Sequence, residues 1–186
     1  MAEWCDDIEK YLKESSDKQY ETGDQGPMTE LDYWRRRMQR LTSITEQIKS
    51  KEVKSVIQLL YSLVKSGINE QSRLTVSSLI RRWKAIDVEL TEATNEAKDN
   101  EKYLRTLEKF IEPLYHNAPS QIVDNLPALM NSIKMIHTIA RYYNTTERMT
   151  TLFVKITNQM IENCKGSILK GGTANDLWNT DLVGLA

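Results

Sequence analysis

The 186-residue chain has few residues that interrupt or crosslink a polypeptide: two cysteines, four prolines and seven glycines. Cys5 and Cys164 allow one disulfide at most, which is not the framework of a small secreted domain. We therefore expect two free thiols in a reducing compartment. Scarce proline and glycine leave little material for turns, and this favours long helices joined by short connections.

Neither charge nor hydropathy points to a nucleic acid or a membrane as a partner. The 25 basic and 26 acidic residues nearly cancel, whereas a dedicated nucleic-acid binder carries a basic excess. No stretch approaches the ~18 consecutive apolar residues of a membrane span. The first seven residues are acidic, where a secretory signal would be basic and then apolar. The 40% of apolar residues is enough for a packed core.

The residue types that carry chemistry are sparse. The two histidines, His116 and His137, have no cysteine near them in the sequence, so neither has the neighbours of a metal site. We expect His116 in a surface turn and His137 half-buried beside a core face. Gly171-Gly172 follows a helical pattern and lacks the lysine and serine of a nucleotide-binding loop. The sequence predicts no catalytic residue, no metal and no cofactor.

What the chain does contain is a repeated apolar stripe with steps of three and four residues. This spacing places the side chains on one helix face, which must be buried against another element. No alternating strand pattern of useful length occurs. We predict an all-α fold of antiparallel bundles of long helices. The clearest stripe consists of Ile122, Leu126, Leu129, Ile133, Ile136, Ala140 and Tyr143.

The stripes and the breaks between them predict the helix boundaries. A first amphipathic helix covers residues 3–21, and a loop with two glycines and a proline follows it. Thr29-Glu30-Leu31-Asp32 resembles a capping box at the start of the second helix. Ser50 is a candidate cap for the third helix, which Ser66-Gly67 would end. Asn144-Thr145-Thr146-Glu147 reads as a stop followed by the cap of a last helix, ending near Gly166 or Gly171-Gly172.

The longest stripe holds a heptad phase for almost forty residues, from Val76 to Leu114. One continuous helix of this length would span ~60 Å. Asn100 falls in the buried phase, where a polar residue breaks a helix or specifies its register. We expect one long helix or two collinear ones, kinked near Asn100 or Pro113. In the next helix we place Pro127 in the first turn, with regular structure from about Asn125 to Tyr143.

The densest positive feature is the group Arg35, Arg36, Arg37 and Arg40. It is the candidate contact for an acidic partner. Consecutive helix residues point about 100° apart, however, so a solvated helix face is the competing interpretation. Trp34 and Trp83 lie in the buried phase of their helices and are expected to pack in the core.

Four segments carry motifs that recur together in one known family. The first is Gly26-Pro27-Met28-Thr29-Glu30-Leu31-Asp32-Tyr33-Trp34-Arg35-Arg36-Arg37. Two others follow in order, Asp99-Asn100-Glu101-Lys102-Tyr103-Leu104-Arg105-Thr106-Leu107-Glu108 and Leu126-Pro127-Ala128-Leu129-Met130-Asn131. The last is Ile136-His137-Thr138-Ile139-Ala140-Arg141-Tyr142-Tyr143-Asn144-Thr145-Thr146-Glu147-Arg148-Met149. In this order the four segments resemble the N-terminal tail, or stem, of dynein heavy chains. The last segment is more similar to axonemal than to cytoplasmic dyneins, and it favours an outer-arm heavy chain.

The resemblance implies a non-catalytic segment of an elongated helical tail, since the family's ATPase ring, stalk and microtubule-binding domain lie elsewhere in the heavy chain. It implies a scaffold for other heavy chains, intermediate chains and light chains, anchored to docking components on the doublet microtubules of a ciliary or flagellar axoneme. We expect residues 1–22 to form an N-terminal helix and residues 23–170 a helical-bundle tail segment. Residues 171–186 are expected to be poorly ordered or to start a further element.

Two other functions are open to a chain of this kind. The long heptad run is also typical of an independent spectrin-like or coiled-coil adaptor that binds a helical partner. A helical di-iron enzyme would need a glutamate three residues before a histidine. Positions 113 and 134 are proline and lysine, which argues against such an enzyme.

Overall fold

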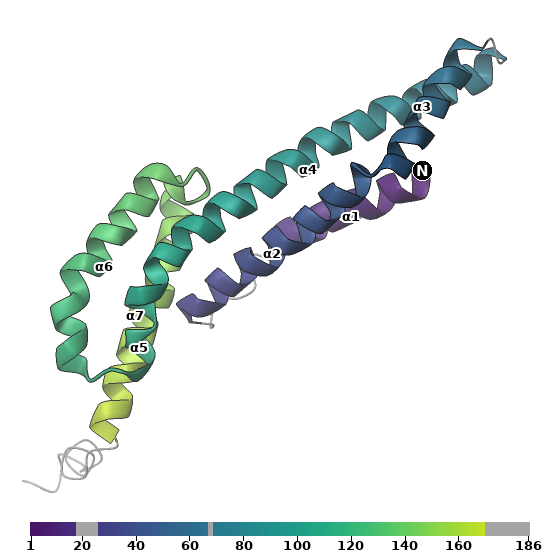
Figure 1. The fold of residues 1–186 in the computed structure, drawn as a ribbon. Helices are drawn as coiled ribbons and strands as arrows, with labels where there is room; N and C mark the ends of the chain where they lie inside the picture. Colours follow the sequence, from purple (N-terminus) through teal and green to yellow (C-terminus); the bar gives the residue numbers. More distant parts are fainter. Residues whose placement is uncertain (18–25, 67–68, 170–186) are drawn as a thin grey trace, which may run out of the picture. The chain divides into compact units, whose positions relative to one another are not determined.

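A computed structural model describes residues 1–17, 26–66 and 69–169 (Figure 1). These residues fall into two compact units. Unit 1 takes its described residues from Met1–Thr22 and Trp34–Asp99, and unit 2 takes its own from Gly23–Tyr33 and Asn100–Ala186. The described residues form helices and turns and contain no strand, which confirms the all-α prediction. None of their helices is both long enough and apolar enough to cross a bilayer.

The helices follow the chain in a simple order. Helices α2 and α4 contribute residues to both units, α1 and α3 belong to unit 1, and the elements after α4 belong to unit 2. The elements are α1 (Ala2–Asp17), α2 (Pro27–Ile48), α3 (Lys51–Lys65), α4 (Glu70–Ile111), α5 (Pro113–His116), α6 (Pro119–Ile139), the 3-10 turn η2 (Tyr142–Asn144) and α7 (Thr146–Leu169).

In unit 1, α1 and α2 run antiparallel. The Arg40 guanidinium of α2 lies 5.0 Å from the ring centre of Tyr11, near the far end of α1. Eight residues later, Ile48 lines the same groove as Trp4 at the start of α1. The hydroxyls of Thr45 and Thr94 lie 3.2 Å apart and join α2 to α4. The apolar core of this unit is made of Cys5, Ile8, Leu12, Trp34, Leu41, Ile48, Val53, Ile80, Trp83, Ile86, Leu90 and Ala97.

The heptad stripe of α4 is confirmed as one continuous helix of 42 residues. Asn100 is 1% exposed and does not interrupt it, although the Asn100 side-chain amide nitrogen has no hydrogen-bond partner within the part of the chain that the structure describes. The apolar residues on either side of it in the stripe, Ala97 and Leu104, are both buried and keep the helix in register. The break comes instead at Pro113, where a new short helix begins. Proline has no N–H to continue the ladder of backbone hydrogen bonds.

Helix α3 buries less than its sequence pattern predicts. Ser50 caps it as expected, accepting a hydrogen bond from the Val53 amide, and Ser66 is the C-cap. Gly67 lies outside the described residues. Of the residues that make up the apolar stripe, Val53 is buried, but Val56 and Leu63 are 38% and 43% exposed. The amphipathic pattern therefore predicts the helix correctly but overestimates the burial of its apolar face. The spacing of apolar residues does not show how much of that face a neighbouring element covers.

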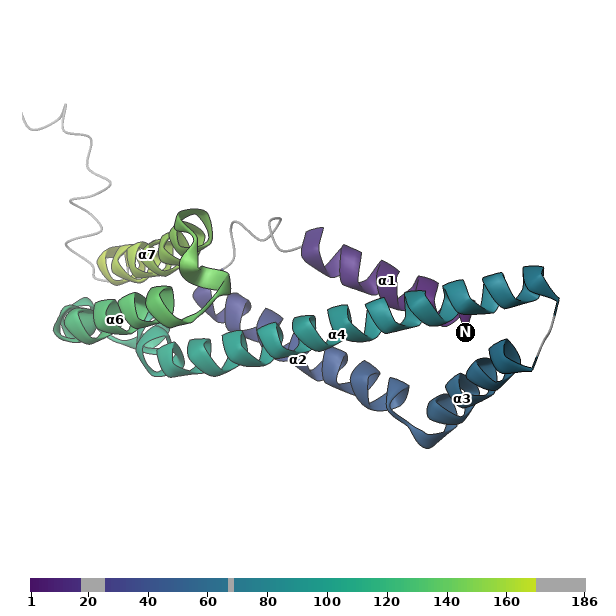
Figure 2. The same ribbon diagram turned by 90° about the horizontal axis from the view of Figure 1, so that it is seen from above.

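Unit 2 is built around the antiparallel pair α6 and α7, joined by the turn η2 and lying side by side in both views (Figures 1 and 2). The predicted stripe of α6 is the core face, since Ile122, Leu129, Ile133 and Ile136 are buried. Helix α6 ends at Ile139 rather than near Tyr143, and the ring of Tyr143 packs edge-on against Tyr142 in the 3-10 turn. The Thr145 hydroxyl caps α7 by accepting a hydrogen bond from the Arg148 amide, as the sequence predicted.

The prediction for Pro127 was wrong. Helix α6 begins at Pro119, which occupies the first turn, and Pro127 lies inside the helix. Pro127 is exposed, so the backbone carbonyl it leaves without a donor can bind water. The buried stripe on the other face holds the helix together across the proline.

The start of α2 also differs from the prediction. Pro27 is the first helical residue, a position for which its backbone geometry is suited. Thr29 is therefore not the cap; its hydroxyl donates to the Gly26 carbonyl oxygen at 2.6 Å. The first helix, α1, is described as far as Asp17. The remainder of its predicted span, and the predicted domain 171–186, lie outside the described residues.

Candidate functional site

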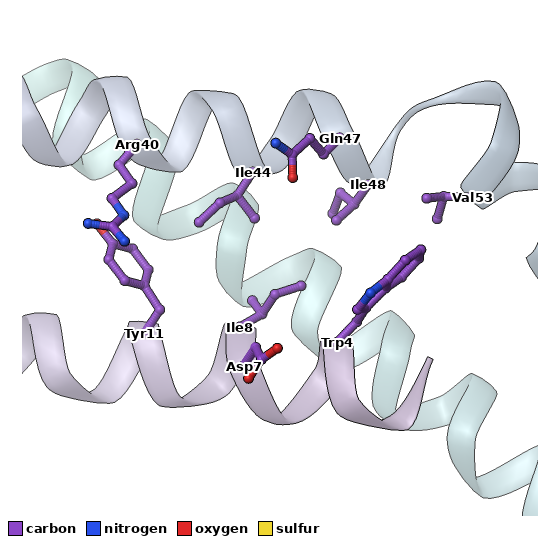
Figure 3. A pocket seen from close by; sticks show the side chains of 9 residues that line it. All are labelled: Trp4, Asp7, Ile8, Tyr11, Arg40, Ile44, Gln47, Ile48 and Val53. Carbon is purple, nitrogen blue, oxygen red and sulfur yellow. The ribbon is translucent and has the colours of Figure 1, made fainter.

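The candidate site of unit 1 is an open groove of about 380 Å³ between α1, α2 and the start of α3 (Figure 3). Its two long walls are faces of α1 and α2. On each helix the residues that face the groove recur at intervals of three and four positions. Apolar side chains line most of the groove, Arg40 and Tyr11 lie at one end, and the polar side chains of Asp7 and Gln47 lie between the two ends. It is lined by Trp4, Asp7, Ile8, Tyr11, Arg40, Ile44, Gln47, Ile48 and Val53.

The two ends of the groove differ in chemistry. At one end Trp4 faces Ile48 and Val53, and the Trp4 side chain remains 47% exposed (Figure 3). At the other end the Arg40 guanidinium stacks over the ring of Tyr11. A half-exposed tryptophan and an arginine are the residue types most often found at the energetic centre of protein interfaces.

Helix α1 is held in place by an ion-pair cluster on its other side. The Arg82 guanidinium of α4 donates hydrogen bonds to the Glu9 carboxylate at 2.7 and 2.8 Å and to the Asp6 carboxylate at 2.5 Å. The bonds from Arg82 hold the pKa of Glu9 below its ordinary value. Of the acidic residues on α1, Asp6 and Glu9 are thus occupied by Arg82, while Asp7 lines the groove.

The four predicted partner-contact arginines do not come together in one patch. Arg36 and Arg40 are exposed, whereas Arg35 and Arg37 are half-buried. Arg40 alone lines the groove. The Nε and Nη1 atoms of Arg37 are buried and have no hydrogen-bond partner among the described residues. Arg37 lies seven residues before Ile44, almost two full turns, so it belongs to the groove-facing side of α2.

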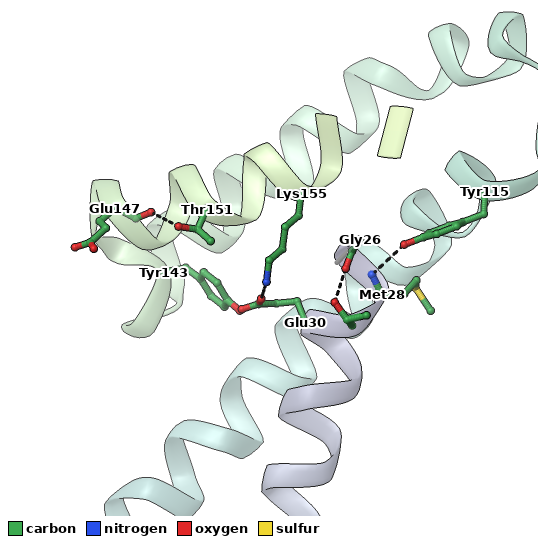
Figure 4. A network of polar contacts seen from close by, with 9 residues as sticks. Gly26, Met28, Glu30, Tyr115, Tyr143, Glu147, Thr151 and Lys155 are labelled. Carbon is green, nitrogen blue, oxygen red and sulfur yellow. Dashed lines mark hydrogen bonds and ion pairs between the residues drawn. The ribbon is translucent and has the colours of Figure 1, made fainter. Parts of the chain in front are cut away.

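Unit 2 contains a buried polar network that the sequence did not reveal (Figure 4). The Glu30 carboxylate, in the first turn of α2, accepts hydrogen bonds from the Lys155 ammonium at 2.6 Å and from the Tyr143 hydroxyl at 2.8 Å. The side chain of Lys155 is 2% exposed and that of Glu30 is 12% exposed. One signal was available: Lys155 stands directly before the buried Ile156 and three residues after the buried Leu152, on the core side of α7.

Beside this network, the backbone at the start of α2 comes close to the side chain of Tyr115. The Met28 amide donates to the Tyr115 hydroxyl at 3.4 Å, and burial raises the pKa of the Tyr115 phenol above its ordinary value. A Cβ added at Gly26 would lie 2.4 Å from the Tyr115 hydroxyl oxygen and 3.0 Å from the Gln159 side-chain oxygen. Glycine is required here because α2 begins where two side chains already fill the space.

We expect Gly26→Ala to destabilise unit 2 by about 1–3 kcal/mol, the usual cost of overpacking. Urea denaturation followed by circular dichroism would measure it. The double variant Gly26→Ala/Tyr115→Phe should recover part of the loss, because it removes the oxygen that the new methyl meets. Gly166→Ala is the matched control: no atom lies within 4 Å of its added Cβ, so a gain in helix stability is expected. Equal losses for the two alanine variants would contradict the steric explanation.

The residues considered for chemistry lie apart from one another. Within the described ranges, no group of three or more His, Cys, Asp or Glu side chains is placed to hold a metal ion. His116 is exposed, as expected for a surface residue. His137 is also exposed, so its predicted half-burial was wrong; it follows the buried Ile136 but points away from the core face. Both cysteines are free thiols as predicted, with Cys5 buried and Cys164 exposed.

Comparison with known proteins gives a consistent result over almost the whole chain. Residues 1–183 match the family model described as dynein heavy chain, N-terminal region 1. The dynein gamma chain of the flagellar outer arm of Chlamydomonas reinhardtii is 43% identical over 185 residues, which cover 100% of this chain and 4% of that protein. The dynein axonemal heavy chain 5 of Rattus norvegicus is 42% identical over 179 residues, covering 96% of this chain and 5% of that protein.

A more distant relative comes from another axonemal structure. The dynein-1-alpha heavy chain of the flagellar inner arm I1 complex of Chlamydomonas reinhardtii is 32% identical over 168 residues, covering 90% of this chain and 3% of that protein. The chain therefore spans about one-twentieth or less of the length of these relatives. With a family model matching nearly every residue, the chain belongs to the dynein heavy chain family and corresponds to the N-terminal region of its members.

Proposed function

We propose that the chain is a non-catalytic scaffold segment in the tail of an axonemal dynein heavy chain. The observation that carries the proposal is the match of residues 1–183 to the N-terminal region of the family. The axonemal relatives place the chain in the axoneme of a cilium or flagellum. Identity to the outer-arm gamma chain is 43%, against 32% for the inner-arm chain, and this favours an outer arm.

The mechanism is rigidity combined with exposed apolar surface. Long packed helices resist bending and can transmit force along a tail. Large apolar side chains that remain exposed on both units would bind neighbouring chains, since contacts that exclude water from such residues are favourable. Leu59 and Leu74 of unit 1 are 64% and 61% exposed, and Val123 and Ile161 of unit 2 are 61% and 50% exposed.

The proposed partners are other heavy chains, intermediate and light chains, and docking components on the doublet microtubules. Among the predicted contact residues, Arg36 and Arg40 are exposed, and their positive charge suits acidic partner surfaces. The family assignment favours this tail function over an independent adaptor, because adaptors of the spectrin or coiled-coil class would not be expected to match the dynein N-terminal region along the whole chain.

Crosslinking of intact axonemes tests the proposal. Amine-reactive crosslinking followed by mass spectrometry should connect exposed lysines of this segment, such as Lys49, Lys54 and Lys134, to other outer-arm subunits. Axonemes stripped of their outer arms are the control and should lose these links. Links found only within the segment would contradict a scaffold function, and ATP turnover by the purified chain above background would contradict a non-catalytic one.

A further inference from the structure

We infer that the groove between α1 and α2 of unit 1 binds an amphipathic helix of a partner protein, with apolar residues at one end and an acidic residue at the other. This inference rests on the scaffold function proposed above and specifies one of its partners. It follows from three features of the groove: its walls, its apolar end and its basic end.

The walls favour a helix as the occupant. The groove runs along two antiparallel helices, whose facing residues are spaced by three and four positions (Figure 3). A third helix lying in such a groove presents side chains at matching intervals, as in other helix-in-groove complexes. From Arg40 to Ile48 the α2 wall rises about 12 Å, or two turns. An occupant must therefore place its polar and apolar contacts about seven residues apart.

The apolar end favours a large aliphatic or aromatic anchor. Trp4, Ile48 and Val53 converge there, and Ile8 and Ile44 continue the apolar surface toward the middle. Ile48 and Val53 are almost fully covered, whereas Trp4 is 47% exposed, so further apolar area is available only on the open side of the groove. Covering that area with a partner's apolar side chains would remove it from water.

The basic end favours a carboxylate. Arg40 is exposed, and one turn before it Arg37 has two buried nitrogen donors without an acceptor among the described residues. A buried guanidinium donor that lacks an acceptor is costly, and a carboxylate is the acceptor that fits its planar fork. Asp6 and Glu9 of α1 already bind Arg82, and Asp7 lines the groove between its two ends. A partner carboxylate would thus pair with the exposed Arg40 and supply an acceptor beside Arg37, whose two buried donors have none among the described residues.

Synthetic peptides test the inference directly. The probes are fluorescent, alanine-based helical peptides of about 20 residues with leucine at positions i and i+4 and either glutamate, glutamine or lysine at i+7, each made in both sequence orders. Binding to the 186-residue chain is measured by fluorescence anisotropy. The glutamate peptide should bind about tenfold more tightly than the lysine peptide, because the arginines at this end of the groove attract the glutamate carboxylate and repel the lysine ammonium.

Variants of the chain supply the decisive comparison. In Arg37→Glu/Arg40→Glu the order should invert, so that the lysine peptide binds more tightly. Arg40→Glu alone should reduce the difference, and it keeps the test valid if Arg37→Glu unfolds the chain. Trp4→Ala should weaken all three peptides at least about tenfold. Lys49→Glu makes the same change of charge at an exposed residue just after the end of α2 that does not line the groove, and it should leave the order unchanged.

Three results would overturn the inference: no binding of any peptide at millimolar concentration, equal binding of the glutamate and lysine peptides, or a dimer of the chain that Trp4→Ala dissociates. The last result would show that a second copy occupies the groove. If one of these results occurs but the axonemal crosslinks are found, the inference about the groove fails and the scaffold function is still supported. If the crosslinks are absent, the scaffold function is contradicted, independently of the peptide results.

Discussion

Lys155→Ala is expected to lower the free energy of unfolding by about 3–5 kcal/mol. The substitution leaves the Glu30 carboxylate in a largely dry site, where the Tyr143 hydroxyl is the one donor that remains among the described residues. Removing one member of a buried ion pair costs this much because the remaining charge is no longer compensated. Urea denaturation would measure the loss, and hydrogen–deuterium exchange of α7 peptides would assign it to unit 2.

A matched pair of controls separates burial from charge. Lys165→Ala, on the same helix, removes an exposed partner of Glu162 and should cost less than about 1 kcal/mol. The double variant Glu30→Leu/Lys155→Met removes both charges and should be more stable than Lys155→Ala, with a remaining deficit of about 1–2 kcal/mol because the Tyr143 hydroxyl loses its acceptor. The explanation fails if Lys155→Ala and Lys165→Ala have the same effect.

Trp34→Ala is the second substitution with a large expected effect, a loss of about 3–5 kcal/mol. Trp34 is 0% exposed and is the largest of the fully buried side chains. Its removal leaves a cavity that neighbouring side chains fill only in part. For a chain of this size the loss corresponds to a fall in melting temperature of roughly 6–20 °C, measured by calorimetry or by circular dichroism.

Trp4→Ala is the natural comparison, since it removes the same side chain from a position that is 47% exposed. Its cost should stay below about 1 kcal/mol, as for most surface substitutions. Trp34→Phe should lie between the two because it keeps an aromatic ring in the core. Similar melting temperatures for Trp34→Ala and Trp4→Ala would contradict the burial that distinguishes them.

Helix type and helix phase could be predicted from the sequence because both depend on local spacing. In the α6 stripe Ile122, Leu129, Ile133 and Ile136 are buried and Leu126 is half-buried. In the α4 stripe most members from Trp83 through Asn100 are buried, as the period requires. Boundaries were less predictable where two local signals compete. Pro127 and Pro119 are both acceptable first-turn residues, and the sequence alone does not say which of them starts the helix. The sequence pattern predicts a cap at Thr29, although Pro27 begins the helix two residues earlier.

The candidate sites depend on contacts between distant segments, which explains why the sequence revealed less of them. The spacing of Trp4, Ile8 and Tyr11 indicates one face of the predicted first helix, but the groove exists only because α2 lies antiparallel to α1. Arg40 was predicted as a contact residue and does line this groove. The four clustered arginines were adjacent in sequence, yet the helix turn distributes them over different sides. Which of them a partner contacts stays a prediction.

The ion pair between Glu30 and Lys155 joins residues that are 125 positions apart. On the ribosome, at about 5–20 residues per second, this gap corresponds to roughly 6–25 s of translation. During that interval the beginning of α2 has been made, but the ammonium that neutralises Glu30 has not. Unit 2 therefore cannot complete its buried network until α7 has emerged, so a nascent chain arrested before residue 155 should expose the Glu30 segment to proteases and chaperones.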